Sequence, residues 1–365
     1  MVHEGVTRWE LEQLTVQGHP RDLGEQQGEH FRERIQQFIA VRFAAVSEYA
    51  AELGRDDITP LREIGRTSQA IFADWDPEAS TEHEGIARGA QVDSLDLFIA
   101  TNITDMRDVL LLPRGEASPP ELEGCTAVLL PGRLTQSGKG LAGQTWDLNP
   151  TDVDYVVGVH RKPVKGPETW SLTCTGCLTL IGMNSEGLAL GTTNIKMHGS
   201  KPGVGYLNVL HRAIRSPGVE EASRIILDAP RSGAHTFWLA DPKQQVEWEA
   251  GPDAAVARTA DDQAVTRTNH CLAPEFIERQ GEPTSETSAK RLAKATAVVE
   301  AGNINPTALR TLFSDRSEGI NSINRYHEDG TDTATNGVFI ASPSDRRLWA
   351  CRGPADRGEW IEHAW

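Results

Sequence analysis

The sequence contains few cysteines and no long hydrophobic run. Five cysteines in 365 residues are too few for a disulfide framework or a dense metal array, and their odd number leaves at least one unpaired. Glu4, Glu10 and Glu12 stand where a secretory signal would carry a basic patch and an apolar run. No apolar stretch approaches the roughly 18 residues needed to cross a membrane. We therefore expect a cytoplasmic protein.

Positive charge is also scarce. Lys and Arg number 36 against 52 for Asp and Glu, which gives a formal net charge of −16 at pH 7. This balance disfavours attraction to phosphate backbones and anionic lipids, so we expect neither a nucleic acid nor a membrane as partner. Hydrophobic residues make up 38% of the chain, enough to bury a sizeable core, which excludes a mostly disordered protein. The length alone suggests about two domains.

Hydrophobic periodicity predicts helices in the first third of the chain. Apolar residues recur at three- and four-residue steps from Phe31 to Tyr49, and a second such stretch runs from Gly85 to Met106. After residue 125, short apolar runs alternate with turn residues roughly every 8 to 12 positions, which is typical of strands. We expect strands over 126–131, 154–161, 170–174 and 177–184, and helical insertions over 207–229 and 285–302. This order favours an α+β fold with mainly antiparallel sheets.

The sharpest change in composition falls at residues 111–124, LLPRGEASPPELEG. This segment holds three prolines, two glycines and three glutamates, which is typical of an exposed connector. It resembles a boundary between two domains, and it ends at Gly124, directly before Cys125.

Cys125 begins a strand-type run, and this position offers a chemistry beyond that of a buried apolar thiol. If the peptide bond before Cys125 were cut, its α-amino group would become a general base beside the thiol. An α-amine titrates near pH 8, against about 10.4 for Lys, so a useful fraction is neutral at cellular pH. Gly124 suits the cut because it lacks a Cβ. The alternative is that Cys125 is a small buried hydrophobic residue.

The motifs around Cys125 resemble the acyl-CoA:6-aminopenicillanic acid acyltransferase family, a branch of the N-terminal nucleophile hydrolases. They are GCTAVLLP and, after a short turn, GLAGQTWDLNP. Upstream, GHPRDLGEQQGEHF and EGIARGAQVDSLDL resemble two glycine-containing helix segments of the family. Downstream, LIGMNSEGLALGTTNI, TRTNHCL and NSINRYH follow in the family's order and spacing, so that the resemblance covers nearly the whole chain.

The resemblance implies a four-layer αββα sandwich made as one domain. It also implies that the precursor cuts itself between Gly124 and Cys125. The products would be an α chain of residues 1–124 and a β chain of residues 125–365, held together as a heterodimer. The composition break at 111–124 then becomes a maturation site inside one domain.

The resemblance also implies site residues beside the nucleophile. Asp147 matches the family's essential Asp, which orients the new α-amine, and Asn269 matches an Asn that donates into the oxyanion hole. Asn194 lies where the related bile-salt and penicillin V hydrolases place a second such Asn. Arg325 matches an Arg near the nucleophile, although Asn324 precedes it where the family often has Cys. Without the family, these residues would read as turn-capping, strand-end and surface residues.

Two further residues are candidates for the substrate pocket. Trp146 lies next to Asp147 and is either a wall of the acyl pocket or a core residue. His235, where the penicillin acyltransferase has a Ser, is a candidate substrate contact. Cys174 and Cys177 form CTGC, which we interpret as structural. The alternative, a dithiol or half of a zinc site, lacks two more ligands at a suitable spacing.

We therefore expect an autoprocessed cysteine amidohydrolase or acyltransferase with no metal and no cofactor. It would act on a small-molecule acyl amide or acyl-CoA through an acyl-enzyme on Cys125. The alternatives are a non-catalytic protein that keeps the fold and a zinc or dithiol protein built on CTGC. The identity of the substrate does not follow from the sequence, because function on a shared fold depends on pocket detail.

Overall fold

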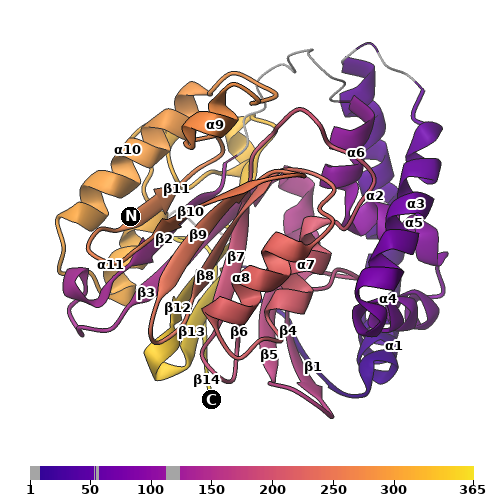
Figure 1. The fold of residues 1–365 in the computed structure, drawn as a ribbon, viewed down its shortest axis with the longest axis horizontal. Coiled ribbons are helices and arrows are strands. Elements are labelled where there is room, and N and C mark those ends of the chain that lie inside the picture. The colour runs from indigo at the N-terminus through magenta and orange to yellow at the C-terminus, as the bar shows by residue number, and fades with distance from the viewer. Residues whose placement is uncertain (1–8, 53, 55–56, 112–123) are drawn as a thin grey trace.

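The computed structural model describes residues 9–52, 54, 57–111 and 124–365. The predicted connector, apart from its end residues Leu111 and Gly124, lies outside the described residues. In the part of the chain that is described, the strands form two sheets that stack face to face between layers of helices (Figure 1).

The larger sheet has the strand order β1-β4-β5-β6-β7-β8-β9-β10. Its strands are β1 (Gln13–Gly18), β4 (Val156–Pro163), β5 (Thr169–Cys174), β6 (Ile181–Asn184), β7 (Ala189–Asn194), β8 (His235–Ala240), β9 (Gln245–Ala250) and β10 (Ala255–Thr259). The other sheet has the order β11-β2-β3-β12-β13-β14. It consists of β2 (Thr126–Leu130), β3 (Leu141–Leu148), β11 (Val265–Arg267), β12 (Ala334–Ser342), β13 (Arg347–Arg352) and β14 (Ile361–Ala364).

One outer layer packs on the larger sheet and contains the N-terminal helices together with α7 and α8. Its helices are α1 (Pro20–His30), α2 (Arg32–Glu52), α3 (Pro60–Trp75), α4 (Pro77–Ala90), α5 (Ser94–Thr101), α6 (Ile103–Leu111), α7 (Tyr206–Ala213) and α8 (Val219–Asp228). The helices α10 (Glu286–Glu300) and α11 (Pro306–Phe313) cover the other sheet, and α9 (Pro274–Ile277) precedes them. The four-layer αββα order and the α+β class are confirmed.

The sheets are mainly antiparallel, as expected, but β1 pairs with β4 in parallel. This strand corrects the prediction that the first third is helical, since β1 is stabilised by pairing with a strand more than 130 residues away in the sequence. Gln144 on β3 connects the two sheets, because its side chain exchanges hydrogen bonds of 2.8 and 2.9 Å with the backbone of Thr192 on β7.

Other predicted elements are interrupted. The stretch from Gly85 to Met106 is divided among three helices, because Gln91 ends α4 in the left-handed conformation and Asp93 caps a new helix. The insertion over 207–229 is two helices, interrupted before Gly218. The strand expected over 177–184 begins only at Ile181.

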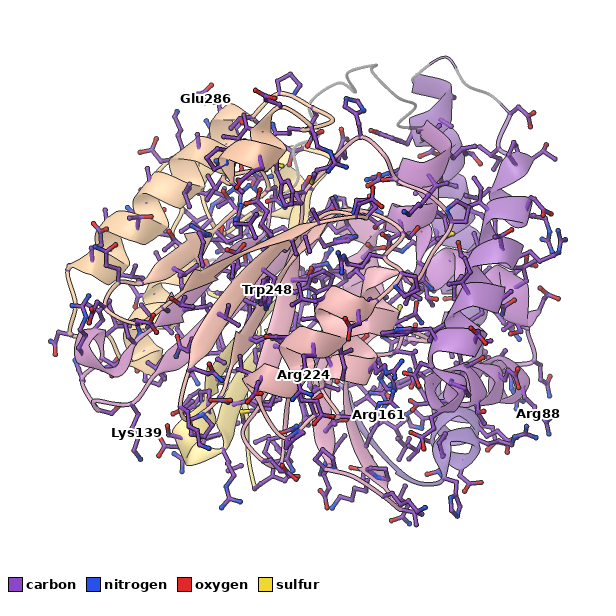
Figure 2. All side chains as sticks on the ribbon, viewed as in Figure 1. Arg88, Lys139, Arg161, Arg224, Trp248 and Glu286 are labelled. Atoms are coloured by element: carbon purple, nitrogen blue, oxygen red, sulfur yellow. The ribbon has the colours of Figure 1, made fainter. Side chains whose placement is uncertain are left out.

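The α1 and α4 helices pack at unusually close range. Gly24 and Gly28 on α1 face Gly85 and Gly89 on α4, and a Cβ on any of the four would come within 2.5 Å of a backbone oxygen of the other helix. The two glycine-containing segments singled out in the sequence are therefore the two halves of one helix–helix contact. Beside this contact, Arg161 on β4 lies between the sheet and the helices and forms a 2.7 Å ion pair with Glu82 (Figure 2). None of the described helices is long and apolar enough to cross a membrane.

Candidate active site

A cavity encloses Cys125 where the two sheets meet the helical layer. About 350 Å³ of the space here is not filled by atoms, and this figure includes space open to solvent. Both sheets and two helices line it, with Thr104, Cys125, Trp146, Asp147, Leu148, Leu180, Thr192, Asn194, Tyr206, His235 and Asn269. All the predicted site residues except Gly124 and Arg325 lie in this wall.

Cys125 is 5% exposed and immediately precedes β2. Its Sγ accepts a hydrogen bond from the backbone N–H of Asp147 at 3.4 Å. The two residues meet because β2 and β3 form an antiparallel pair in which Thr126 lies opposite Thr145. An N–H directed at the sulfur stabilises the thiolate, which is the nucleophilic form of cysteine.

Gly124 packs directly against Asp147 and Arg325. A Cβ at this position would lie 2.6 Å from Asp147 Oδ2 and 3.1 Å from Arg325 Cδ, so a larger residue cannot be accommodated without a shift. The Asp147 carboxyl is buried, and the side chains of Thr335 and Thr145 lie beside it. Burial raises the pKa of Asp147 to about 7, although the charges of Arg325 and Arg291 oppose this. This carboxyl can therefore change its protonation state near neutral pH.

Arg325 lies behind Gly124 rather than in the cavity wall. It is 1% exposed, so the interpretation as a surface arginine is wrong. Its backbone N–H donates to Thr335 Oγ1 at 3.0 Å, and its guanidinium donates to Thr287 Oγ1. Its positive charge interacts with Asp147 and Cys125. All three groups are buried, and charge interactions are stronger there because water screens them less.

Asn269 follows β11 and is hydrogen-bonded to Asn194 in the cavity wall. Its Nδ2 donates to the backbone carbonyl of Asn194 at 3.0 Å, and its backbone N–H donates to Ser288 Oγ at 2.9 Å. An amide nitrogen carries two hydrogens, so a second N–H of Asn269 remains for a ligand.

Arg291 on α10 is a site residue that the sequence analysis missed. It is fully buried, and its Nη1 donates to the carbonyl oxygens of Gly124 at 2.8 Å and Cys125 at 2.5 Å. Its Nη2 donates to Asn269 Oδ1 at 3.1 Å. A sequence signal did exist. The buried positions of α10 are Thr287, Ser288, Arg291, Ala295 and Val299, so that an arginine occupies the core-facing side of an amphipathic helix.

Trp146 separates the main cavity from a second, smaller one of about 190 Å³. The two share Trp146, Leu180 and Tyr206, and the second reaches Arg42, Thr173, Cys174, Cys177 and Leu207. A β-bulge on β12 lies across from Trp146 and Asp147.

His235, at the start of β8, is held in the cavity wall by Asp105 on α6. Its Nε2 lies 3.2 Å from Asp105 Oδ1, and its ring stacks on Tyr206 at a centroid distance of 4.3 Å. Asp105 Oδ2 also accepts the backbone N–H of Tyr206 at 2.9 Å. The N-terminal helices therefore contribute to the cavity, a contribution that the sequence analysis did not predict because Asp105 carries no local motif.

The CTGC motif lies in a turn beside the second cavity. The N–H of Cys177 donates to the carbonyl of Cys174 at 3.0 Å, and both residues are buried. Burial raises the pKa of the Cys177 thiol to about 12, so it is protonated at neutral pH and a poor metal ligand. Among the residues that the structure describes, no group of three or more His, Cys, Asp or Glu side chains is arranged to hold a metal ion.

Comparison with known proteins gives a consistent family assignment. Residues 133–356 match the family model described as acyl-coenzyme A:6-aminopenicillanic acid acyl-transferase. The chain is 23% identical over 332 residues to the 40 kDa form of the acyl-coenzyme A:6-aminopenicillanic-acid-acyltransferase of Emericella nidulans. This alignment covers 89% of the present chain and 88% of the relative.

Solved structures of low sequence identity are also similar to this chain. A mutant of the conjugated bile acid hydrolase from Clostridium perfringens is 12% identical, with a TM-score of 0.45, and the match covers 66% of this chain and 97% of that one. The penicillin V acylase from Agrobacterium tumefaciens is 15% identical, with a TM-score of 0.45 and coverages of 65% and 86%.

Proposed function

Because the family model matches more than half of its residues, the chain belongs to the acyl-coenzyme A:6-aminopenicillanic acid acyl-transferase family, and from this premise we propose that it is a self-processing cysteine amidohydrolase or acyltransferase. The observation that carries the proposal is the arrangement at Gly124 and Cys125. A buried thiol receives an N–H from Asp147, and the preceding glycine is packed against the Asp147 carboxyl.

Maturation begins when Cys125 Sγ attacks the carbonyl carbon of Gly124. The thiol gives up its proton, the C–N bond between Gly124 and Cys125 breaks, and a thioester forms while the nitrogen takes a proton and becomes the α-amine of Cys125. Water then hydrolyses the thioester and leaves Gly124 with a carboxylate. Asp147 suits the role of proton acceptor because its raised pKa, about 7, allows it to take a proton near neutral pH.

In the mature enzyme the α-amine of Cys125 takes the proton of its own thiol as the sulfur attacks a substrate amide or thioester. Asn269 donates its second Nδ2 hydrogen to the oxyanion, with Asn194 on the same side of the cavity. Asp147 and Arg325 set the charge and orientation of the α-amine. Water or an amine then takes the acyl group, giving hydrolysis or acyl transfer.

The substrate of this site would be a small molecule with an acyl group. The relative from Emericella nidulans is named for acyl-coenzyme A and 6-aminopenicillanic acid, and the cavity at Cys125 is partly open to solvent. Trp146 and Leu180 would contact the acyl group, because they form the boundary between the two cavities. His235 would contact a polar part of the substrate.

The α and β chains would remain together as one heterodimer after the cut. The N-terminal region supplies β1, which pairs with β4 along six residues, and α6, which holds His235. A separated β chain would therefore lose part of its sheet and one wall of its cavity.

An acyl-enzyme trapping experiment tests the proposal. The purified protein is mixed with a panel of N-acyl amino acids, β-alanyl amines and acyl-CoA thioesters. The reactions are quenched with acid, and the mass of each chain is measured by mass spectrometry. We expect an acyl adduct on the chain that begins at Cys125, and none in a Cys125→Ala variant. Hydrolysis of an amide by the wild-type chain and the variant at equal rates would contradict the proposal.

The second candidate function is a non-catalytic or unprocessed binding protein that retains this fold. The cavity itself is compatible with it, but a binding protein would not need a thiol, a raised-pKa carboxyl and an N–H directed at the sulfur in one place. Reversible binding of a panel compound, with no product and no adduct on wild-type protein, would favour this candidate.

A further inference from the structure

The residue best placed to act on the bond between Gly124 and Cys125 is Arg291, which no sequence motif identified. Arg291 contacts the backbone carbonyls on both sides of the intact bond. Its Nη1 lies 2.8 Å from Gly124 O, the oxygen on which negative charge would develop if Cys125 attacked this carbonyl. Asn269 instead donates to the carbonyl of Asn194.

We propose that Arg291 is the catalytic electrophile of self-cleavage and that, after the cut, it positions Asn269 for the mature reaction. This inference rests on the proposed function. During cleavage the sulfur–carbon bond forms and the electron pair of the carbonyl moves onto Gly124 O, where the guanidinium stabilises it. When that pair re-forms the carbonyl, the C–N bond breaks and the nitrogen of Cys125 takes up the proton.

The surroundings of Arg291 hold its guanidinium in this geometry. Its Nε donates to Thr287 Oγ1 at 3.3 Å, and Arg325 donates to the same hydroxyl. Its Nη1 also bonds Cys125 O and Thr126 Oγ1, so the backbone is held on both sides of the bond to be cut. A donor fixed in advance in a buried site stabilises a developing oxyanion without having to reorganise.

The mature role follows from the contacts that cleavage leaves in place. The bond from Arg291 Nη2 to Asn269 Oδ1 is 3.1 Å long and fixes which way the Asn269 amide faces. With its oxygen bound to Arg291, the amide directs its NH₂ group toward Asn194 and the cavity. Arg291 therefore acts on the mature reaction through Asn269, as a positioning residue.

The test follows the conversion of full-length precursor, made by cell-free translation, into two chains by mass spectrometry over time. The variants are Arg291→Ala, Arg291→Lys and the control Lys290→Ala. Lys290 lies on the exposed side of the same helix, where it pairs with Glu286, which points outward in Figure 2. Loss of one oxyanion donor typically slows a reaction about 100- to 1,000-fold, and we expect a loss of this size for Arg291→Ala.

Arg291→Lys should fold and cleave at least about tenfold more slowly than wild type, because an ammonium cannot make the paired contacts of a guanidinium. Added guanidinium ion, far below unfolding concentrations, should partly restore cleavage of Arg291→Ala, which a merely misfolded variant would not show. Once processed, Arg291→Lys should show a reduced kcat with little change in KM, since Asn269 acts in the transition state.

Wild-type cleavage rates in folded Arg291→Ala or Arg291→Lys would overturn the proposal for Arg291. The proposal would also be overturned if Arg291→Ala cleaved slowly and added guanidinium ion did not restore its cleavage, while Arg291→Lys cleaved at the wild-type rate. These outcomes leave the proposed function intact. A wild-type precursor that never cleaves would instead contradict the proposed function.

Discussion

In the proposed mechanism, single residues at the junction of Gly124 and Cys125 carry the chemistry. The sulfur, the carbonyl to be attacked, a carboxyl with a pKa near neutrality and two buried arginines meet within one network of short contacts. Each of these groups makes a separate contribution, so each can be tested by a separate substitution.

Gly124→Ala is expected to block or strongly slow self-cleavage. Its Cβ would lie 2.6 Å from Asp147 Oδ2 and 2.7 Å from Asp147 Cβ, so the backbone must shift and the Gly124 carbonyl would leave Arg291. The mass of the purified variant should be that of the uncut chain, while its melting temperature shows whether it folds. Normal cleavage of this variant would mean that the close packing at Gly124 has no role in maturation.

The stability of the precursor should depend on pH through Asp147. Its pKa is about 7 in the folded chain and has an ordinary value of 3.8, so the folded state binds a proton that the unfolded state has released. Stability from this group is therefore full at low pH and declines as the pH rises from about 4 to about 7.

The comparison uses Cys125→Ala, which keeps the chain uncut, with and without Asp147→Asn. As the pH rises from 5 to 7.5, we expect the melting temperature of Cys125→Ala to fall relative to that of the variant that also carries Asp147→Asn. A difference in melting temperature that does not change with pH would show that Asp147 is not the titrating group.

His235 should affect substrate turnover and leave maturation unchanged. Its ring lies in the cavity wall and is held by Asp105, but no described contact joins it to Gly124. We expect His235→Asn to lower kcat/KM by about five- to tenfold, the worth of about one hydrogen bond, at a normal rate of self-cleavage. A variant with unchanged kcat/KM for every active compound would remove His235 from the substrate site.

The positions of Cys125, Asp147, Asn194 and Asn269 around one cavity were predicted, because a family motif marks each of them. Arg291 and Asp105 were not, because each acts through a contact between elements distant in sequence. The carbonyl that Arg291 binds is 167 residues away.

At the scale of elements, the contact between α1 and α4 fixes the helical layer. The four glycines allow the two backbones to touch, and beside them Glu82 accepts from Arg161 and from His211. The charge of Arg161 and the contact with the His211 ring hold the pKa of Glu82 at about 2 despite burial. Stability from Glu82 should therefore persist down to about pH 4.5 and be lost as the pH falls toward 2.

Gly85→Ala should destabilise the protein without altering its chemistry. The new Cβ would lie 2.5 Å from Arg21 O, a backbone atom that cannot move alone, and overpacking of this kind costs about 1–3 kcal/mol. Denaturant unfolding measures the loss, with Glu84→Ala on the exposed side of α4 as the control. Equal stability of Gly85→Ala and the control would show that the helices can separate at no cost.

Element boundaries were predicted less well than element types. Periodicity shows which residues face the core, but α4, α5 and α6 share one apolar pattern that is interrupted at Gln91, Asp93 and Asn102. The strand β1 was missed because it is stabilised by pairing with β4 and not by its own sequence.

For the whole molecule, the change from helical to strand patterns indicated an α+β fold, and the family resemblance implied the four-layer order. The sequence could not indicate how the two sheets are joined, which depends on contacts such as that of Gln144 with Thr192. The proposal at this scale is that one folded unit contains two chains. Its N-terminal part contributes a strand and a cavity wall to the C-terminal part.

The most direct test of the account is the mass of the purified protein, measured under denaturing and native conditions beside Cys125→Ala. The account predicts two denatured species, residues 1–124 and 125–365, that elute together as one native complex. It also predicts a single uncut species of 39.9 kDa for Cys125→Ala. A wild-type chain that stays uncut at 39.9 kDa and matches Cys125→Ala in an amidase assay would contradict it.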